Sequence, residues 1–320
     1  MKDATAKRNA QLQETQPARM QNIAAIVEHL KRGASPASKR IGIELEHICL
    51  DADGRALGYS QTGGVRDALE ALSERYPEKT VHNGDPLGVG RPGAVITLEP
   101  AAQVELSAGP FERLADAQAS MRTEIWKHCN LARCGTVPGA LDPDFDFTDY
   151  AAFLLDFPAI VRLDAQGEAH LDTRTFGEIY AAKPMNDADV AHAMSMTWPD
   201  VRLKSYIEIR PADSMPIPYV IAYGALIKGI FYTPENLTKL RCTLGPVGGT
   251  AVATAKDELM KHGYSAEVYG HPAAKLCDML IELGRKGLEP DEQGYIEPLA
   301  ELVAARETLA ERQLRAEGAK

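Results

Sequence analysis

The sequence has no apolar run near the roughly 20 residues that a membrane-spanning helix needs. Its first 20 residues are polar and charged, and they lack the apolar centre of a secretory signal peptide. We therefore expect a protein that does not enter a membrane and that stays in the cytoplasm.

Positive charge and paired cysteines are also scarce. The chain has 35 Lys and Arg against 45 Asp and Glu, a formal net charge of -10. Affinity for nucleic-acid backbones comes mainly from Lys and Arg, so we expect small-molecule substrates and no nucleic-acid partner. The five cysteines are odd in number and form no C-x-x-C pair, and we interpret them as reduced thiols.

The periodicity of the sequence predicts its elements. Helices are predicted over 20–32, 65–75, 113–128, 148–157, 219–231 and 251–262 and from about residue 299, and strands over 41–50, 94–107 and 201–210. The stretch GDPLGVGRPG (84–93) is rich in Gly and Pro and predicts a hairpin loop. Because strands do not alternate regularly with helices, the pattern favours an α+β fold with an antiparallel sheet.

Each predicted strand has one apolar and one ionised face, since side chains alternate sides along a strand. The ionised faces carry Glu44 and Glu46 in the first strand, Glu99, Gln103 and Glu105 in the second, and Arg202, Lys204, Tyr206, Glu208 and Arg210 in the third. For any one strand, charges that simply face water explain the pattern. Its repetition on three strands favours a shared site.

Crowded carboxylates raise one another's pKa unless cations neutralise them. Magnesium takes oxygen ligands and usually combines one or two carboxylates with water and substrate phosphates. The glutamates are more than one ion needs, and they suit two or three ions bridging a nucleoside triphosphate. Arg202, Lys204 or Arg210 would then meet phosphate or substrate carboxylate charge.

Four stretches carry a family signature: GIELEH (42–47), ITLEPAAQVELS (96–107), MRTEIWKHCNLARCG (121–135) and RLKSYIEIRPADS (202–214). They resemble, in the same order, the G-x-E-x-E, L-E-P-G-x-Q-x-E-L-S, M-R-S-x-I-W and Y-x-E-x-R-x-x-D stretches of plant-type glutamate–cysteine ligases. Ala101 and Ala102 stand where that family usually has glycines.

The resemblance implies a role for each matching residue. The metal-binding carboxylates would be Glu44, Glu46, Glu99, Glu105 and Glu208. Arg122 would hold the substrate glutamate, with Gln103 also at the substrate. Arg210 would face phosphate and, with Glu208, take part in catalysis, and Lys204 and Arg202 would contact the nucleotide.

The resemblance also implies a fold and an activity. The fold would be glutamine-synthetase-like, with a curved, mainly antiparallel sheet lining a funnel-shaped active site. We expect a polar tail over 1–19, a catalytic domain over 20–235 and a helical region over 236–320 packed on it. The activity would use ATP and Mg²⁺ to form γ-glutamylcysteine through a γ-glutamyl phosphate, the first step of glutathione biosynthesis.

The sequence departs from the family in its middle. A segment on the order of a hundred residues, the size of a small domain, is expected between the second and third stretches, where only residues 108–120 lie. Two alternatives to a glutamate–cysteine ligase therefore stay open. One is a carboxylate–amine ligase acting on another amine, and the other is a nucleotide- or metal-binding protein without turnover.

Overall fold

The computed structural model describes residues 17–34, 39–51, 55–114, 134–164, 166, 168–212 and 215–318. They form two compact units, each discontinuous in sequence. The first unit contains the described parts of Met1–Ala37, Cys129–Ala212 and Gly248–Thr250. The second contains those of Ser38–His128, Asp213–Val247 and Ala251–Lys320. The predicted domain boundaries stay predictions.

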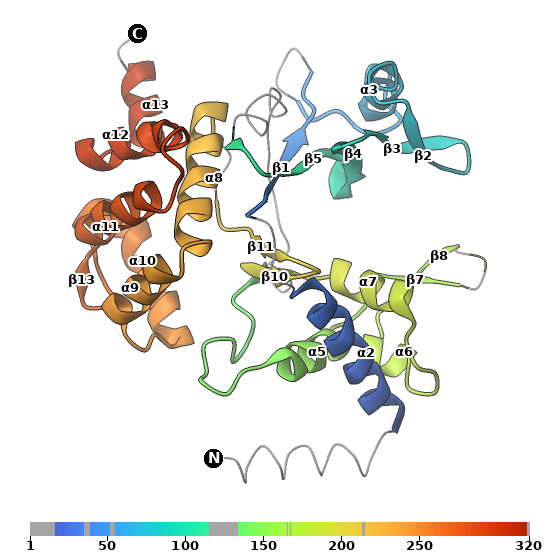
Figure 1. Ribbon diagram of the computed structural model, residues 1–320. Helices are drawn as coiled ribbons and strands as arrows, with labels where there is room; N and C mark the ends of the chain where they lie inside the picture. Colours follow the sequence, from blue (N-terminus) through green and yellow to red (C-terminus); the bar gives the residue numbers. More distant parts are fainter. Residues whose placement is uncertain are drawn as a thin grey trace. The chain divides into compact units, whose positions relative to one another are not determined.

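The second unit contains a five-stranded antiparallel sheet of order β1-β5-β4-β3-β2 (Figure 1). Its strands are β1 (Ile41–Ile48), β2 (Glu78–His82), β3 (Asp85–Arg91), β4 (Ala94–Glu99) and β5 (Gln103–Phe111). The predicted α+β class and antiparallel sheet are thus confirmed. The predicted funnel shape stays a prediction.

One face of this sheet carries the core of the second unit. Strand register puts Ile43 of β1 opposite Ala108 of β5, and Ile96 of β4 opposite Leu106 of β5. These side chains are buried together with Val65 and Leu69 of α3 (Val65–Leu72), the helix drawn beside β2 and β3 in Figure 1. The predicted alternation of apolar and ionised side chains on β1, β4 and β5 is confirmed.

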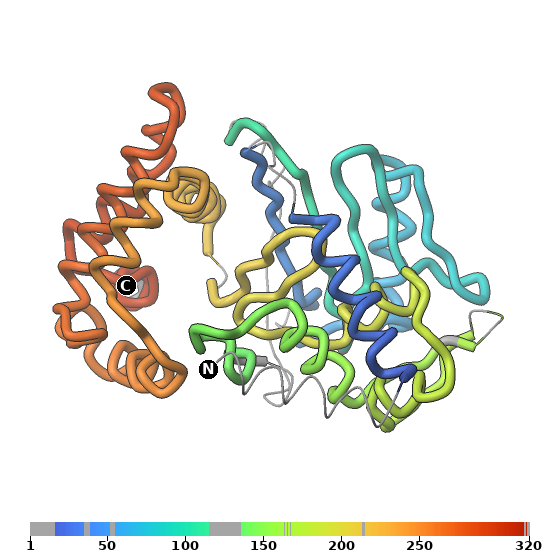
Figure 2. Tube along the Cα trace, turned by 60° about the horizontal axis from the view of Figure 1, so that its bottom comes forward, coloured from blue at the N-terminus to red at the C-terminus, as the bar shows by residue number. Residues whose placement is uncertain are grey.

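The C-terminal part is helical, as predicted. Figure 2 shows its helices in orange and red, namely α8 (Ile217–Phe231), α9 (Pro234–Leu244), α10 (Gly249–His262), α11 (Ala273–Lys286), α12 (Glu297–Ala305) and α13 (Leu309–Gly318). Helices α8 and α11 cross so closely that a Cβ on Gly229 would lie 1.9 Å from the carbonyl oxygen of Gly284. Glycine is therefore required at Gly229. The single final helix predicted from residue 299 is wrong, since α12 and α13 are separate helices.

Two predictions about the sheet are also wrong. Residues 84–93 are not a loop, because β3 occupies most of them and pairs with both β2 and β4. Residues 94–107 are not one strand, because the short 3₁₀ turn η1 (Pro100–Ala102) reverses the chain between β4 and β5. The strand β2 has no counterpart among the predicted elements.

The first unit is built on four helices of the described chain, α2 (Pro17–Gly33), α5 (Phe147–Leu155), α6 (Phe176–Ile179) and α7 (Asp187–Ser195). Each helix contributes to one buried hydrophobic cluster, which includes Ile26, Leu154, Phe176 and Val190. The short strand pairs of this unit are β6 (Cys134–Gly135) with β9 (Trp198–Pro199), β7 (Val161–Leu163) with β8 (Ala169–Leu171), and β10 (Val201–Leu203) with β11 (Ile207–Ile209). No helix among the described residues is long and apolar enough to cross a membrane.

Candidate active site

The polar face of the five-stranded sheet carries four of the predicted glutamates. Glu46 of β1 lies opposite Glu105 of β5, which in turn lies opposite Thr97 of β4. Residues directly opposite each other in an antiparallel pair have Cβ atoms about 4.5–5.5 Å apart on the same face. Glu44 and Glu99 lie on this face too, opposite Ser107 and Gln103 respectively.

Hydroxyl groups on this face donate to the carboxylates. Ser107 Oγ donates to Glu105 Oε1 at 2.8 Å, and Thr97 Oγ1 lies 3.5 Å from Glu99 Oε1. Glu44, Glu46, Glu99 and Glu105 all have further interactions in the structure, so none is without a partner. The face is therefore an organised polar surface.

Gln103 is the buried member of this face, at 7% exposure. Its Nε2 donates to the carbonyl oxygen of Pro100 at 3.1 Å, which fixes the orientation of the amide. Its Oε1 is buried and has no hydrogen-bond partner within the described ranges. A buried amide oxygen of this kind is costly unless something donates to it, so Gln103 is ready to accept an N–H or O–H.

The carboxylate pair of this face fits a magnesium ion in its chemistry. Mg²⁺ prefers oxygen ligands and commonly takes only one or two from protein carboxylates. Glu46 and Glu105 could supply these two. Across the described parts of the chain, no group of three or more His, Cys, Asp or Glu side chains is close enough to hold a metal. A metal here would therefore need substrate phosphates and water to complete its coordination.

The third predicted strand is wrong, because residues 201–210 form a hairpin instead. Strands β10 and β11 pair antiparallel, and Lys204 N donates to Tyr206 O at the turn (Figure 1). The pairing puts Arg202 directly opposite Glu208. Arg202 and Glu208 on the ionised face of the hairpin are buried, whereas Ile207 on the other face is 59% exposed.

Glu208 accepts from three cations in this buried face. Its Oε2 accepts from Arg202 Nε at 3.1 Å and Nη2 at 2.8 Å, and lies 3.1 Å from Lys204 Nζ. Its Oε1 accepts from Arg210 Nη1 at 2.5 Å. Burial alone would raise the pKa of Glu208, but Arg202, with Arg210 and Lys204, outweighs burial and lowers it to about 2.

A neighbouring helix anchors the hairpin. The Oη of Tyr150, on α5, accepts from the backbone N–H of Leu203 at 3.1 Å. Tyr150 is almost fully buried, and this burial raises its pKa. The backbone of β10 is therefore held against the core of the first unit.

The structure groups the predicted site residues into two sets. Glu44, Glu46, Glu99, Gln103 and Glu105 share the sheet face of the second unit, and Arg202, Lys204, Glu208 and Arg210 share the hairpin of the first. Arg122 and most of the helix predicted over 113–128 lie outside the described residues. The assigned roles stay predictions.

One buried ionic contact was not predicted from the sequence. Lys228 of α8 is 8% exposed, and its Nζ lies 2.7 Å from both Glu292 Oε2 and the carbonyl oxygen of Glu112. Glu292 Oε1 accepts from the backbone N–H of Leu114 at 3.0 Å. A single lysine in an otherwise apolar helix is the sequence signal that could have indicated it.

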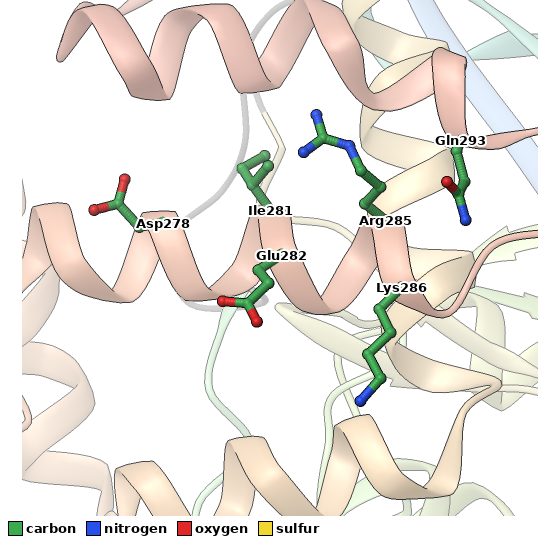
Figure 3. Close-up of a pocket in the computed structure, with 6 residues that line it drawn as sticks. All are labelled: Asp278, Ile281, Glu282, Arg285, Lys286 and Gln293. Carbon is green, nitrogen blue, oxygen red and sulfur yellow. The ribbon is translucent and has the colours of Figure 1, made fainter.

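A pocket of about 400 Å³ lies along α11 (Figure 3). Asp278 pairs with Arg306 at 2.6 Å, and Arg285 with Glu297 at 2.7 Å. The residues that line the pocket are Asp278, Ile281, Glu282, Arg285, Lys286 and Gln293, and none of them is a predicted site residue.

Comparison with known proteins identifies the family. The model of glutamate-cysteine ligase family 2 (GCS2) matches residues 118–317, more than half of the chain. The chain belongs to this family. The matched range includes Arg122 and the β10–β11 hairpin, and it begins after the five-stranded sheet.

Curated members of this ligase family are similar over most of the chain. It is 27% identical over 247 residues to a chloroplastic glutamate–cysteine ligase of Medicago truncatula, covering 69% of this chain and 46% of that protein. A chloroplastic glutamate–cysteine ligase A of Oryza sativa subsp. indica is 25% identical over 268 residues, covering 79% and 52%. The chain thus spans about half the length of the curated relatives it matches.

Proposed function

We propose that the protein is an ATP-dependent ligase that joins the γ-carboxylate of glutamate to the amine of cysteine. Membership of the glutamate-cysteine ligase family supports this proposal. The observation that carries it is the polar sheet face, where Glu46 lies opposite Glu105 beside the buried acceptor Gln103. We further propose that the reaction serves the first step of glutathione biosynthesis in the cytoplasm.

Two bond exchanges make up the proposed reaction. An oxygen of the γ-carboxylate attacks the γ-phosphorus of ATP, the bond to the ADP oxygen breaks, and a γ-glutamyl phosphate forms. The amine nitrogen then attacks the γ-carbonyl carbon, loses its proton, and expels phosphate with the transferred oxygen. No side chain has to act as a nucleophile in either step.

The protein's groups bind and orient the reactants. Glu46 and Glu105 would hold Mg²⁺, which supplies positive charge at the phosphates when it is bound. Gln103 Oε1 would accept an N–H from an amino-acid substrate, because its amide is already fixed by Pro100. Arg210 would place positive charge beside phosphate, with its guanidinium held by Glu208.

A ligase for a different amine is the second candidate. The chain spans only 46% of the Medicago truncatula relative. Only residues 108–120 lie where the family resemblance implies a longer segment, and such a difference near the substrate pocket would change which amine is recognised. The carboxylate substrate and nucleotide would then stay the same.

Phosphate release with glutamate, ATP and Mg²⁺ across a panel of amines separates the candidates. We expect release that requires both glutamate and an amine, fastest with cysteine. Fastest release with another amine would support the second candidate. No release with any amine, together with retained ATP binding, would mark a binding protein without turnover.

A further inference from the structure

The contacts of the β10–β11 hairpin conflict with the metal-binding role that the family resemblance gives to Glu208. A carboxylate has two oxygens and about four lone-pair sites. Four nitrogen atoms already contact Glu208, namely Arg202 Nε, Arg202 Nη2, Lys204 Nζ and Arg210 Nη1, all within 3.1 Å. A metal ion would have to displace several of them.

The charge around Glu208 also disfavours a divalent cation. Among the described residues, Glu208 is the carboxylate that contacts Arg202, Lys204 and Arg210, and its own side chain is only 9% exposed. A dication bound here would stand beside guanidinium and ammonium groups in a poorly hydrated site, where like charges repel strongly.

Arg202 holds Glu208 from the interior of the first unit. Arg202 is 6% exposed, and its Nη1 donates to the carbonyl oxygen of Thr197 at 3.1 Å. Its Nε and Nη2 donate side by side to the same Glu208 oxygen across the strand pair. The planar guanidinium therefore fixes Glu208 in one orientation, which an ammonium group could not do.

We infer that Glu208 is a positioning carboxylate that holds Arg210 and Lys204 in place and is itself fixed by Arg202, rather than a magnesium ligand. The chain of contacts runs from Thr197 through Arg202 and Glu208 to Arg210. Arg202 accordingly acts through Glu208 instead of contacting the nucleotide. This inference rests on the proposed function for what Arg210 does, but the assignment of Glu208 stands on the hairpin alone.

Binding of Mn²⁺ tests the inference without turnover. Mn²⁺ has a paramagnetic signal that is lost on binding, so titrations of the full chain with a non-hydrolysable ATP analogue give the number of bound ions and their Kd. With the analogue at a concentration that saturates each variant, we expect Glu208→Gln to bind the wild-type number of ions with a Kd for Mn²⁺ within about twofold of wild type. The matched variant Glu105→Gln should weaken Mn²⁺ binding about tenfold or remove one ion, as is typical when a metal site is disturbed. Loss of an ion or a tenfold weaker Kd in Glu208→Gln would overturn the inference.

Affinity for the ATP analogue tests the positioning role. Glu208→Gln, Arg202→Met and Arg210→Lys should each weaken it, and Glu208→Gln should add little once Arg210→Lys is present, because Glu208 acts through Arg210. Independent, fully additive effects of the two substitutions would contradict positioning.

Failure of the proposed function can be told apart from failure of the inference about Glu208. Wild-type protein that binds neither Mn²⁺ nor the analogue would refute that function. The inference would then be decided by the urea unfolding midpoints of Arg202→Met, Glu208→Gln and the double variant. A double variant no less stable than either single variant would support the contact between the two residues, and fully additive losses would overturn the inference.

Discussion

Glu46 and Glu105 lie directly opposite each other on the neighbouring strands β1 and β5, both half-buried. Like charges in such positions destabilise a sheet unless something of opposite charge compensates them. Two carboxylates at this spacing offer oxygen ligands of the kind that Mg²⁺ takes from proteins, as the proposed function requires.

Glu105→Gln is expected to remove the magnesium-dependent part of nucleotide binding. An ATP analogue with Mg²⁺ should stabilise the wild type more than the separate effects of the two added together. A ligand about 100-fold above its Kd contributes about 2.7 kcal/mol. Thermal melts with analogue, Mg²⁺, or both measure this stabilisation, and simply additive shifts in the wild type would count against a joint site.

Glu78→Gln is the matched control for that variant. Glu78 is an exposed residue of the edge strand β2. It lies opposite Gly90 of β3, on the same sheet face as Glu105. The variant Glu78→Gln should show the same rise in melting temperature with analogue and Mg²⁺ together as the wild type. An equal loss in both variants would indicate a general effect of charge.

Ala102→Gly is expected to stabilise the second unit. Ala102 has φ of 57°, a left-handed conformation that costs an L-residue about 1–2 kcal/mol. The greater freedom of glycine in the unfolded chain offsets part of the gain. We expect a net stabilisation of about 0.5–1 kcal/mol in urea unfolding. Ala94→Gly, in the buried face of β4, should instead destabilise the unit. Destabilisation by Ala102→Gly would show that the backbone there is not strained.

Lys228→Met should destabilise the protein strongly. Removing this cation leaves the buried Glu292 without its partner, and breaking a buried pair in this way costs about 3–5 kcal/mol. The double variant Lys228→Met with Glu292→Gln should recover much of the loss, since Gln keeps an acceptor for Leu114 N–H. Urea unfolding measures both.

Lys79→Met provides the comparison. Lys79 and Glu70 are also 2.7 Å apart, but their side chains are 37% and 51% exposed. We expect its free energy of unfolding to fall by less than about 1 kcal/mol. A similar effect of both lysine variants would mean that the Lys228 contact is not buried in solution.

The ion pairs of Glu208 should make stability depend on acidity. Its pKa is about 2 in the folded chain against an ordinary 4.5. Because the folded pKa is the lower one, the stabilisation is fully present above about pH 4.5 and is lost as the pH falls toward 2. The difference in free energy of unfolding between wild type and Glu208→Gln should therefore narrow from pH 6 to pH 3. A difference that does not change over this range would contradict the ion pairs.

Local patterns predicted the faces of the strands but not where the chain reverses. Alternation is local, so Glu44, Glu46 and Glu105 could be placed on one face before the sheet was known. The reversal between β4 and β5 depends on Ala102 taking a positive φ, which residues other than glycine rarely do. The turn between β10 and β11 contains Lys204 and Tyr206 and lacks the usual Gly, Pro or Asn signal.

Contacts between distant residues lie beyond what periodicity predicts. Strand β3 contains Pro86, Gly88 and Gly90, a composition that favours loops, yet pairing with β2 and β4 makes it a strand. A Cβ at Gly88 would lie only 2.9 Å from the carbonyl oxygen of Ile96, so close packing needs glycine there. Lys228 and Glu292 are 64 residues apart, and their pairing depends on how α8 packs.

Transfer of oxygen from glutamate to phosphate tests the central claim most directly. In the proposed reaction, the γ-carboxylate oxygen that attacks ATP leaves with the phosphate when the amide forms. Glutamate labelled with ¹⁸O in its γ-carboxylate, incubated with ATP, Mg²⁺, cysteine and the protein, should therefore give γ-glutamylcysteine and phosphate carrying one ¹⁸O, both measured by mass spectrometry. Phosphate released without ¹⁸O, or no γ-glutamyl product from any amine, would contradict the claim.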